Sequence, residues 1–450
     1  MSDFKSKTLI NSIKDSIIFR ILLIGILILL LLIPSAMIKA LIDEREHRKD
    51  SVINEICSKW ALEQTITGPV IDLPYKTVVE SLITDQNGKE KKVLREEIRF
   101  AHFLPNKLQI RGSIIPEIRK RGIYRAVVYT ADLIIDGNFL FPDFKRLNLD
   151  EKDILWNKAL LSFGINDMRG INRNIEAKWN DNNVILEPGL KNNDIIDQGV
   201  NSKIDFKTNN TFSIKINIRG SSVINFIPLG KETIVKLNSA WDSPSFSGAF
   251  LPKERNIDKK GFYAKWEIFD YNRTFPQQWI DKERNVNGFK FGVELFTPVG
   301  EYQKAIRSVK YASLFIFLTF LAFFLLIEIL NKKRIHPIQY LLVGFALCLF
   351  YILLISISEH LNFNIAYLIS SICIIGLTSI YTKSISGKIN ITILMSIMLV
   401  CFFSFLFIIL QLEDYSLLAG SIGLFIILTI IMIGTRKIDW YSLKLEKKEK

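Results

Sequence analysis

Residues 21–38 read ILLIGILILLLLIPSAMI, a run of 18 residues without a single charge. As an α-helix at about 1.5 Å per residue, this run is about 27 Å long, which is just enough to cross the hydrocarbon core of a bilayer. No clear small-x-small cleavage site follows it, so we interpret it as an uncleaved anchor rather than a signal peptide. Pro34 lies near its C-terminal end, where a helix has few backbone hydrogen bonds to lose.

Further apolar runs lie after residue 308 of this 450-residue chain, in which 49% of the residues are hydrophobic. Only 23 Gly, 13 Pro and 4 Cys are present against 32 Phe and 13 Tyr, which excludes collagen-like, disordered and disulfide-stapled classes. The sequence therefore predicts a membrane α-helical protein with six transmembrane helices. The five C-terminal spans are expected at Val309–Leu330, Ile338–Ser358, Ile365–Tyr381, Ile389–Leu410 and Tyr415–Gly434.

Lysine and arginine alternate between the loops of these spans. Basic residues precede the first span and follow the second, fourth and sixth, whereas the loops at 359–364 and 411–414 contain none. The positive-inside rule then places both termini in the cytoplasm and the long segment between spans one and two on the outer side of the membrane. The expected organisation is a cytoplasmic N-terminus (1–20), the first span (21–38), an extracytoplasmic domain (39–308), a five-helix bundle (309–434) and a basic cytoplasmic tail (435–450).

The net charge of +13 is distributed unevenly along the chain. Residues 39–307 contain 42 Lys/Arg and 36 Asp/Glu, which gives +6, and the remainder contains 16 and 9, which gives +7. The excess thus lies in the short flanks of the spans, where membrane topology explains it, and no nucleic-acid motif accompanies it. We expect the lipid bilayer as a partner, and no nucleic acid. The sequence leaves the oligomeric state open.

The large domain shows a periodicity of two. The dipeptide Asn87-Gly88 lies between the apolar stretches Val78–Thr84 and Val93–Phe100, which is a strong signal for a β-hairpin. Residues Phe212–Ile218 alternate strictly between apolar and polar side chains, and Tyr124–Ile135 is similar. Short strands without alternating helices indicate a β-rich, sandwich-like domain inserted between the first span and the bundle.

A helix over Asp43–Glu63, ended by Gly68-Pro69, is expected to connect the first span to this domain. The domain contains one cysteine, Cys57, so it has no internal disulfide. The asparagine-rich stretches at 180–183 and 209–210 predict surface loops. The remaining cysteines lie in predicted spans, where we interpret them as small packing residues: Cys348, Cys373 and Cys401.

Catalytic and metal-binding motifs are absent from the sequence. The four histidines have no metal-ligand spacing, and the chain has no P-loop, nucleophile elbow or dinucleotide fingerprint. We therefore expect no metal, no cofactor and no enzymatic activity, although an enzyme of cell-wall or lipid metabolism stays open as a minor alternative.

Apart from Lys310 at the outer edge of the second span, Glu328 is the one acidic or basic residue inside the five C-terminal spans, and such a residue is a functional candidate by default. It lies close to the cytoplasmic end and to the basic residues 332–334, so a salt-bridged structural role is the stronger of its two interpretations. His336-Pro337 begins the third span, where proline suits a first helical turn. Glu359 and His360 follow that span in the outer loop, where we interpret them as polar residues at the membrane interface.

Nine short motifs carry a resemblance that covers residues 45 to 382. They are ITGP at 66–69, LPY at 73–75, RGIY at 121–124, PLGK at 228–231, WDSPSFSGAFLP at 241–252, PVGEYQK at 298–304, VKYA at 309–312, RIHPIQY at 334–340 and SEH at 358–360. Together these stretches resemble the CreD family of bacterial inner-membrane proteins. The resemblance implies a multi-pass protein of the bacterial inner membrane with its large domain in the periplasm, linked with cell-envelope integrity and produced under the Cre two-component system, with effects on colicin tolerance and, in some bacteria, on the response to β-lactams. It brings no reaction or ligand, and an envelope protein is the partner expected for the periplasmic domain.

Two of these motifs have alternative interpretations from their residues alone. In the RGIY motif, Arg121-Gly122 predicts a turn that leads into a strand, with the side chain of Tyr124 packed inward. The WDSPSFSGAFLP motif at 241–252 fits either an ordered segment packed on the core or an exposed recognition surface, and packing is the stronger interpretation. Its candidate residues are Trp241, Pro244, Phe246, Gly248 and Phe250.

The functional prediction is a non-enzymatic interaction or scaffold protein, whose extracytoplasmic domain binds an envelope component while the helices anchor it. A transporter or flippase-like protein is the alternative, because five spans cluster at the C-terminus. The charged groups that a coupled transporter needs near the midplane are missing from the predicted spans, which weakens this alternative.

Overall fold

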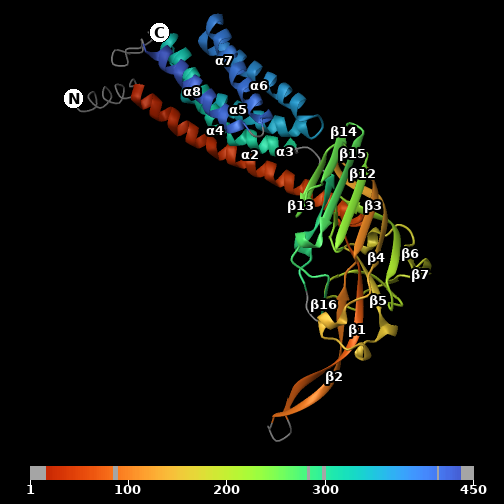
Figure 1. The fold of residues 1–450 in the computed structure, drawn as a ribbon. Coiled ribbons are helices and arrows are strands. Elements are labelled where there is room, and N and C mark those ends of the chain that lie inside the picture. The colour runs from red at the N-terminus through yellow and green to blue at the C-terminus, as the bar shows by residue number, and fades with distance from the viewer. Residues whose placement is uncertain (1–16, 85–89, 281–283, 296–300, 413–414, 437–450) are drawn as a thin grey trace. The chain divides into compact units, whose positions relative to one another are not determined.

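The structure is a computed structural model (Figure 1). Its contacts divide the chain into two compact units, one of residues 51–298 and one of residues 1–50 with 299–450. The first unit consists mainly of strands and the second of helices (Figure 1). The described residues are 17–84, 90–280, 284–295, 301–412 and 415–436.

Six helices of the described residues are long and apolar enough to cross a membrane, which confirms the predicted number. The second of them, α4, continues into a π-helical segment, and a short amphipathic helix, α3, precedes it. The bounds are α2 (Ile17–Trp60), α3 (Glu301–Lys310), α4 (Ala312–Phe323) with its π-helical segment η7 (Phe324–Leu330), α5 (Pro337–Ser358), α6 (Phe363–Ser386), α7 (Ile389–Gln411) and α8 (Ser416–Thr435).

The first helix differs from its prediction. The expected span 21–38 and the expected helix 43–63 form one continuous helix of 44 residues, α2, which passes through Pro34 without a break. The predicted stop at Gly68-Pro69 is wrong, because α2 ends at Trp60 and Gly68-Pro69 lies inside strand β1. There the pairing of β1 with β5 shifts register, and a Cβ on Gly68 would lie 3.1 Å from the carbonyl oxygen of Ser162. Glycine is thus used for close backbone approach in a bulge.

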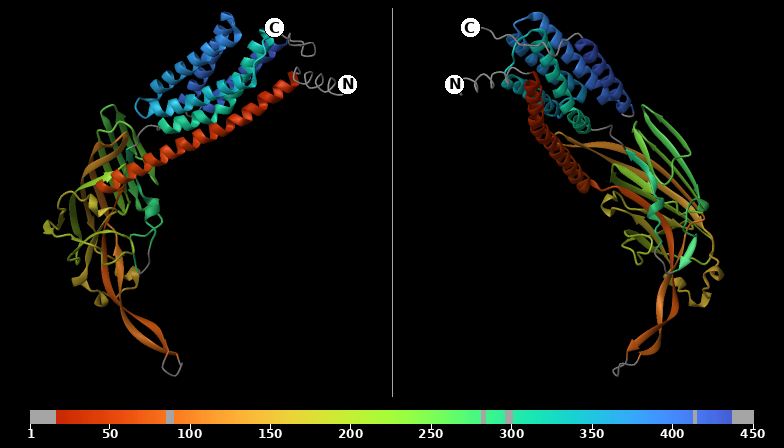
Figure 2. Two further views of the ribbon diagram at one scale, coloured as in Figure 1. Left: turned by 180° about the vertical axis from the view of Figure 1, so that it is seen from behind. Right: turned by 90° about the vertical axis from the view of Figure 1, so that its left-hand side faces the viewer.

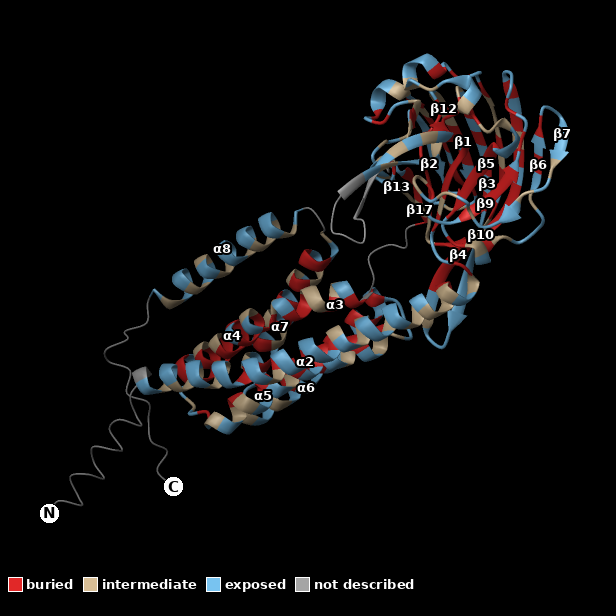
Figure 3. Cartoon of the chain, turned by 90° about the horizontal axis from the view of Figure 1, so that it is seen from below, coloured by how far each residue is buried: buried red, intermediate tan, exposed pale blue. Residues whose placement is uncertain are grey.

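Small residues bring some membrane helices close together. A Cβ on Gly344 of α5 would lie only 2.1 Å from the Leu31 side chain of α2, so glycine allows these two helices to pack tightly. Gly423 of α8 accommodates the ring of Phe405 of α7 in the same way. Exposed and half-buried residues alternate along α8, as Figure 3 shows, and none of its described residues is buried. Of the cysteines in the spans, Cys348 is buried as predicted, whereas Cys373 and Cys401 are exposed.

Two sheets form the β-rich unit, which confirms the predicted fold class. Within the described residues, the nine-stranded sheet has the order β13 (Pro244–Gly248), β17 (Phe291–Leu295), β11 (Val223–Phe226), β1 (Gln64–Thr84), β5 (Leu160–Ile165), β9 (Gly199–Lys203) and β8 (Glu187–Pro188), and β2 (Glu90–Phe103) joins β1 to β16 (Gln278–Ile280). The eight-stranded sheet has the order β14 (Glu254–Asp258), β15 (Gly261–Phe269), β12 (Glu232–Ser239), β3 (Lys107–Arg121), β4 (Tyr124–Phe139), β10 (Asn210–Ser221), β6 (Glu176–Trp179) and β7 (Asn182–Val184). Short 3₁₀ helices at 144–147, 151–153, 156–158, 168–170, 270–272 and 287–289 connect some of the strands.

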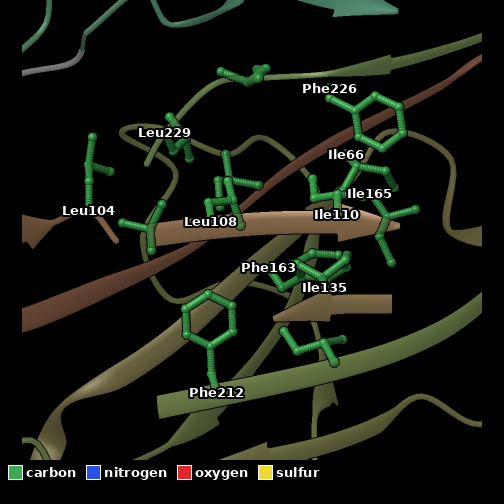
Figure 4. Packing of buried hydrophobic residues seen from close by; sticks show 14 of the residues in the cluster. Ile66, Leu104, Leu108, Ile110, Ile135, Phe163, Ile165, Phe212, Phe226 and Leu229 are labelled. Atoms are coloured by element: carbon green, nitrogen blue, oxygen red, sulfur yellow. The ribbon is translucent and has the colours of Figure 1, made fainter. Parts of the chain in front are cut away.

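The core of this unit is made of side chains from the two sheets. Strand β3 alternates between exposed and buried residues over its first half, as expected when one face of a sheet packs on another layer. Phe212, Ile214, Ile216 and Ile218 of β10 are all buried, which confirms the strand predicted from their spacing. Figure 4 shows residues of both sheets in contact, among them Ile110, Phe163 and Phe226. The asparagine-rich stretches are only partly loops, because Asn210 is a buried residue of β10.

The predicted hairpin is confirmed. Strands β1 and β2 pair antiparallel from Ile71 with Phe103 out to Thr84 with Glu90, and the turn at Asn87-Gly88 lies outside the described residues. Up to Tyr75 strand β1 is buried in the sheet, and beyond it the two strands leave the unit as a two-stranded arm (Figure 2). We call residues 76–84 and 90–99 the β1/β2 ribbon.

Candidate functional site

Glu328 is buried in the helical unit, where it contacts two other elements. Nη1 of Arg20, in α2, lies 2.6 Å from Oε2 of Glu328. The hydroxyl of Tyr340, in α5, donates a hydrogen bond of 3.0 Å to Oε1. Each carboxylate oxygen therefore has a partner of its own. We call Arg20, Glu328 and Tyr340 the Glu328 cluster.

The local fold explains how the cluster forms. Glu328 lies in the π-helical segment η7, and a π turn has a wider repeat than an α turn, so it rotates the following side chains relative to a continuous α-helix. An ionised residue among apolar helices is costly unless it is paired, and the Arg20 guanidinium supplies the opposite charge. The geometry is that of a structural ion pair that ties α2 to α5 and to the end of α4. Arg20 was overlooked as a partner in the sequence analysis, because 308 positions separate it from Glu328.

A second polar contact lies at the other end of α5. The Tyr302 hydroxyl, in α3, donates a hydrogen bond of 2.9 Å to Oε1 of Glu359, and Nη1 of Arg45 lies 3.6 Å from the same oxygen. Because Arg45 belongs to α2, that helix is held to α5 near both ends of the bundle. His360 is exposed, and its backbone N–H donates a hydrogen bond of 3.0 Å to the Ile357 carbonyl.

His336 and Pro337 begin α5 as predicted. The Nδ1 atom of His336 accepts a hydrogen bond of 3.4 Å from the backbone N–H of Ile338, and the Gln339 side chain accepts one from the backbone of His336. Pro337 occupies the first helical position. The pair therefore caps a helix, and the exposed imidazole is engaged in that cap.

The motif around Arg121 is a turn between β3 and β4, as predicted. Gly122 has φ +60°, a conformation that favours glycine. Arg121 is exposed and forms an ion pair with Glu55 near the end of α2. Tyr124 is half-buried rather than fully packed inward.

The motif around Trp241 packs against the core. Residues Pro244–Gly248 form strand β13, paired with β17. The Phe246 ring meets the rings of Phe262 and Trp266 edge to face, at centroid distances of 5.9 and 5.6 Å. Phe250 does the same with Phe291 at 6.0 Å, and Trp241 also packs on this cluster. A Cβ on Gly248 would lie 2.2 Å from the carbonyl oxygen of Lys290, so this position needs glycine. This geometry favours packing over an exposed recognition surface.

A buried polar network in the β-rich unit was not expected from the sequence. His102 in β2 is fully buried, with Nδ1 2.8 Å from Oδ1 of Asp72 in β1 and Nε2 3.2 Å from Oδ2 of Asp194. The Ser162 hydroxyl donates to the other oxygen of Asp72. Asp72 and His102 are direct neighbours in the β1/β2 register, so hairpin pairing combined with residue type is the signal that could have found them.

The order of these groups does not support nucleophilic catalysis. Ser162 contacts the carboxylate rather than the imidazole, so His102 is not positioned to take a proton from the serine hydroxyl. In the described part of the chain, no group of three or more His, Cys, Asp or Glu side chains is arranged to hold a metal ion. The network satisfies buried polar groups and joins β1, β2 and β5.

The β1/β2 ribbon is an exposed feature with several apolar side chains. Val78, Leu94 and Ile98 are more than half exposed, and the register places them on one face of the ribbon. Charged residues alternate with them, and the exposed ion pairs Lys76–Glu96 and Lys92–Glu80 join the two strands across the same face.

The fold and these sites define a multi-pass membrane protein with an inserted two-sheet β domain. The family model described as "Inner membrane protein CreD" matches residues 16–441. The chain is also 33% identical over 433 residues to the Inner membrane protein CreD of Escherichia coli (strain K12), with 93% of each chain covered. It therefore belongs to the CreD family of multi-pass inner-membrane proteins.

Proposed function

We propose that this protein supports the integrity of the bacterial envelope as a non-enzymatic scaffold, whose β-rich domain binds a protein partner through the β1/β2 ribbon. The ribbon is the observation that carries this proposal. Three exposed apolar side chains lie on one face of the ribbon. Within its described residues, β1 and β2 pair with each other and neither pairs with a third strand on its outer edge. Isolated two-stranded ribbons are marginally stable in water, and free strand edges are templates for pairing with another chain.

The orientation belongs to the same proposal. Both termini lie in the cytoplasm and the β-rich domain lies in the periplasm, because lysine and arginine alternate between the loops in the way that the positive-inside rule requires. The ribbon then faces the envelope.

The helices act as an anchor in this proposal. Glu328 contacts Arg20 and Tyr340. Glu359 contacts Tyr302 and Arg45. Each of these two carboxylates therefore joins different helices of the bundle. A carboxylate engaged in this way supports a fixed bundle better than a proton relay.

Removal of the ribbon tests the proposal. In the shortened variant, residues 76–98 are replaced by a two-residue Asn-Gly turn. Because Tyr75 and Arg99 lie opposite each other in the β1/β2 pairing, this turn can join them without disturbing the rest of the sheet. We expect the shortened protein to insert and fold, as shown by unchanged tryptophan fluorescence, yet to fail in restoring detergent resistance to cells that lack the native protein. Full restoration by the shortened protein would refute the proposal.

A groove between α6 and α7 favours a second candidate, a flippase-like protein. It has a volume of about 430 Å³ and is lined mainly by apolar side chains, with the hydroxyls of Tyr367, Ser371 and Ser404 among them. Such a groove fits an acyl chain. Ser371→Phe would fill it, and a loss of envelope function with the ribbon intact would favour this candidate. Ile372→Phe, at the neighbouring groove position, tests whether filling the groove alone produces the effect.

A further inference from the structure

The free edge of β2 has a definite length. Residues 90–100 of β2 pair with β1, and β16 pairs with β2 only at residues 101–103. On the side away from β1, the backbone of the ribbon part of β2 therefore has no neighbouring strand among the described residues. A partner strand of about nine residues fits between the hairpin turn and β16.

The strand at that edge is basic at its N-terminal end and acidic at its C-terminal end. Residues 91–97 read KKVLREE, with two lysines before Val93-Leu94-Arg95 and two glutamates after. A strand of this kind is complementary to itself when it runs antiparallel, because its basic half then meets its acidic half. Few unrelated strands would match it in both charge and direction.

We infer that the partner at this edge is the β2 strand of a second copy of the chain, paired antiparallel about a two-fold axis at Leu94. This inference rests on the proposed function and names its partner. In this register Leu94 lies opposite Leu94 of the partner subunit, and Lys92 lies opposite Glu96 of the partner subunit. The pairing spans residues 90–98 and forms a four-stranded ribbon in the order β1, β2, β2, β1.

Charge selects this register over its neighbours. Two-fold pairing about Lys92, Arg95 or Glu96 would place each of these residues opposite its own copy, and like charges directly opposite are destabilising. Pairing about Leu94 places an apolar residue on the axis and opposite charges on either side. Leu94 is 69% exposed in the single chain, so pairing also removes apolar surface from water.

Cysteine cross-linking tests the register in the full-length protein in membranes. The four native cysteines are first replaced by alanine, and this background must keep envelope function. Leu94→Cys then places two thiols across one antiparallel pair, where Cα atoms lie about 4.5–5.5 Å apart and a disulfide can form. The control is Val78→Cys, an exposed position on the same face, whose two copies would lie roughly 20 Å apart across four strands.

We expect Leu94→Cys to give at least tenfold more disulfide-linked dimer than Val78→Cys on a non-reducing gel. Equal cross-linking of the two variants would indicate packing of ribbon faces or random collision and would overturn the inference, and so would the absence of dimer from both.

A mixing experiment tests charge complementarity. One tagged chain carries Lys92→Glu and a differently tagged chain carries Glu96→Lys, each with Leu94→Cys. A dimer of two Lys92→Glu chains, or of two Glu96→Lys chains, has like charges opposite each other at both contacts. The mixed dimer has opposite charges at both contacts. The cost within each chain, at Glu80 for Lys92→Glu and at Lys76 for Glu96→Lys, is the same whichever chain it pairs with, so it does not bias the distribution.

We expect the mixed dimer to make up nearly all of the dimers instead of its statistical share of one half, and a statistical distribution would contradict the register. These outcomes are separable from the proposed function. If the chain without its ribbon loses envelope function but Leu94→Cys does not cross-link, the scaffold proposal survives and the second copy is excluded as its partner. If the chain without its ribbon keeps envelope function, the scaffold proposal fails whatever the cross-linking shows.

Discussion

The two units of this chain are stabilised in different ways. In the β-rich unit, apolar side chains of two sheets are removed from water, so burial itself stabilises the fold. In the helical unit, the alternative environment of an apolar side chain is lipid, which is equally apolar, and close packing and polar contacts remain as the source of specificity. Hydrophobic truncations should therefore harm the first unit most, and loss of a charge should harm the second.

Tryptophan and cysteine residues report on the two units separately. Six of the seven tryptophans lie between residues 60 and 279, so fluorescence follows the β-rich unit. Cys348 is buried between α5 and α2, where its sulfur lies 3.8 Å from the Ser35 hydroxyl, so its reactivity toward a maleimide follows the helical unit.

The largest effect is expected from Trp266→Ala. Trp266 is fully buried in β15, contacts the rings of Phe246 and Phe291, and donates a hydrogen bond to the Phe250 carbonyl. Truncation of such a side chain costs about 3–5 kcal/mol, which we expect in urea unfolding followed by fluorescence of the remaining tryptophans. Phe350→Ala in α5 is the matched variant in the bundle, and an equal loss of stability there would break the contrast between the units.

Arg20→Met should cost about 3 kcal/mol in the helical unit, because it leaves the buried Glu328 carboxylate with only the Tyr340 hydroxyl as partner. Maleimide labelling of Cys348, with the exposed Cys373 and Cys401 replaced, should accelerate while tryptophan fluorescence stays unchanged. Adding Glu328→Gln should restore slow labelling, because it removes the unpaired charge. Labelling of the double variant as fast as that of Arg20→Met would argue against the ion pair.

His102→Leu should cost about 2 kcal/mol in the β-rich unit, because Asp72 is buried and loses one of its two side-chain partners. The comparison variant is Asp72→Asn with His102→Gln, in which neutral amides can still hydrogen-bond. A cost in the single variant no larger than in the double variant would show that the network contributes little.

These effects separate what was predictable from the sequence from what was not. The six spans, the hairpin at Asn87-Gly88 and the strand at Phe212 follow from local periodicity, which is encoded within a few residues. The stop at Gly68-Pro69 was predicted wrongly, because a glycine needed for a β-bulge and one that ends a helix look alike in sequence. Arg20 with Glu328, and Asp194 with His102, are contacts between distant positions, and one sequence contains no signal for them.

A smaller, pH-dependent effect is expected at Asp167. Its carboxylate accepts two hydrogen bonds from the Arg169 guanidinium and others from the backbone N–H groups of Leu62 and Arg169, and the Arg169 guanidinium in particular lowers the pKa of Asp167. The unfolded chain then takes up the proton first, so this contribution to stability is present at neutral pH and is lost as the pH falls below about 4. Asp167→Asn should flatten the acid side of the stability curve measured by fluorescence, and an unchanged acid side would contradict this assignment.

The smallest effect on folding is expected in the ribbon. Val78→Ser removes an apolar side chain that is 60% exposed, so the free energy of unfolding should change by about 0.5 kcal/mol or less. The same substitution at the buried Val70 of the same strand, Val70→Ser, should cost several times more, because it leaves a cavity and a buried hydroxyl. Strand β1 thus has a buried part in the core and an exposed part in the ribbon. The difference in the free energy of unfolding between the two variants shows that the first part stabilises the fold, whereas the second is available to a partner. Equal costs at the two positions would mean that the ribbon is packed in the membrane-bound protein, and its exposed apolar face would then already be occupied.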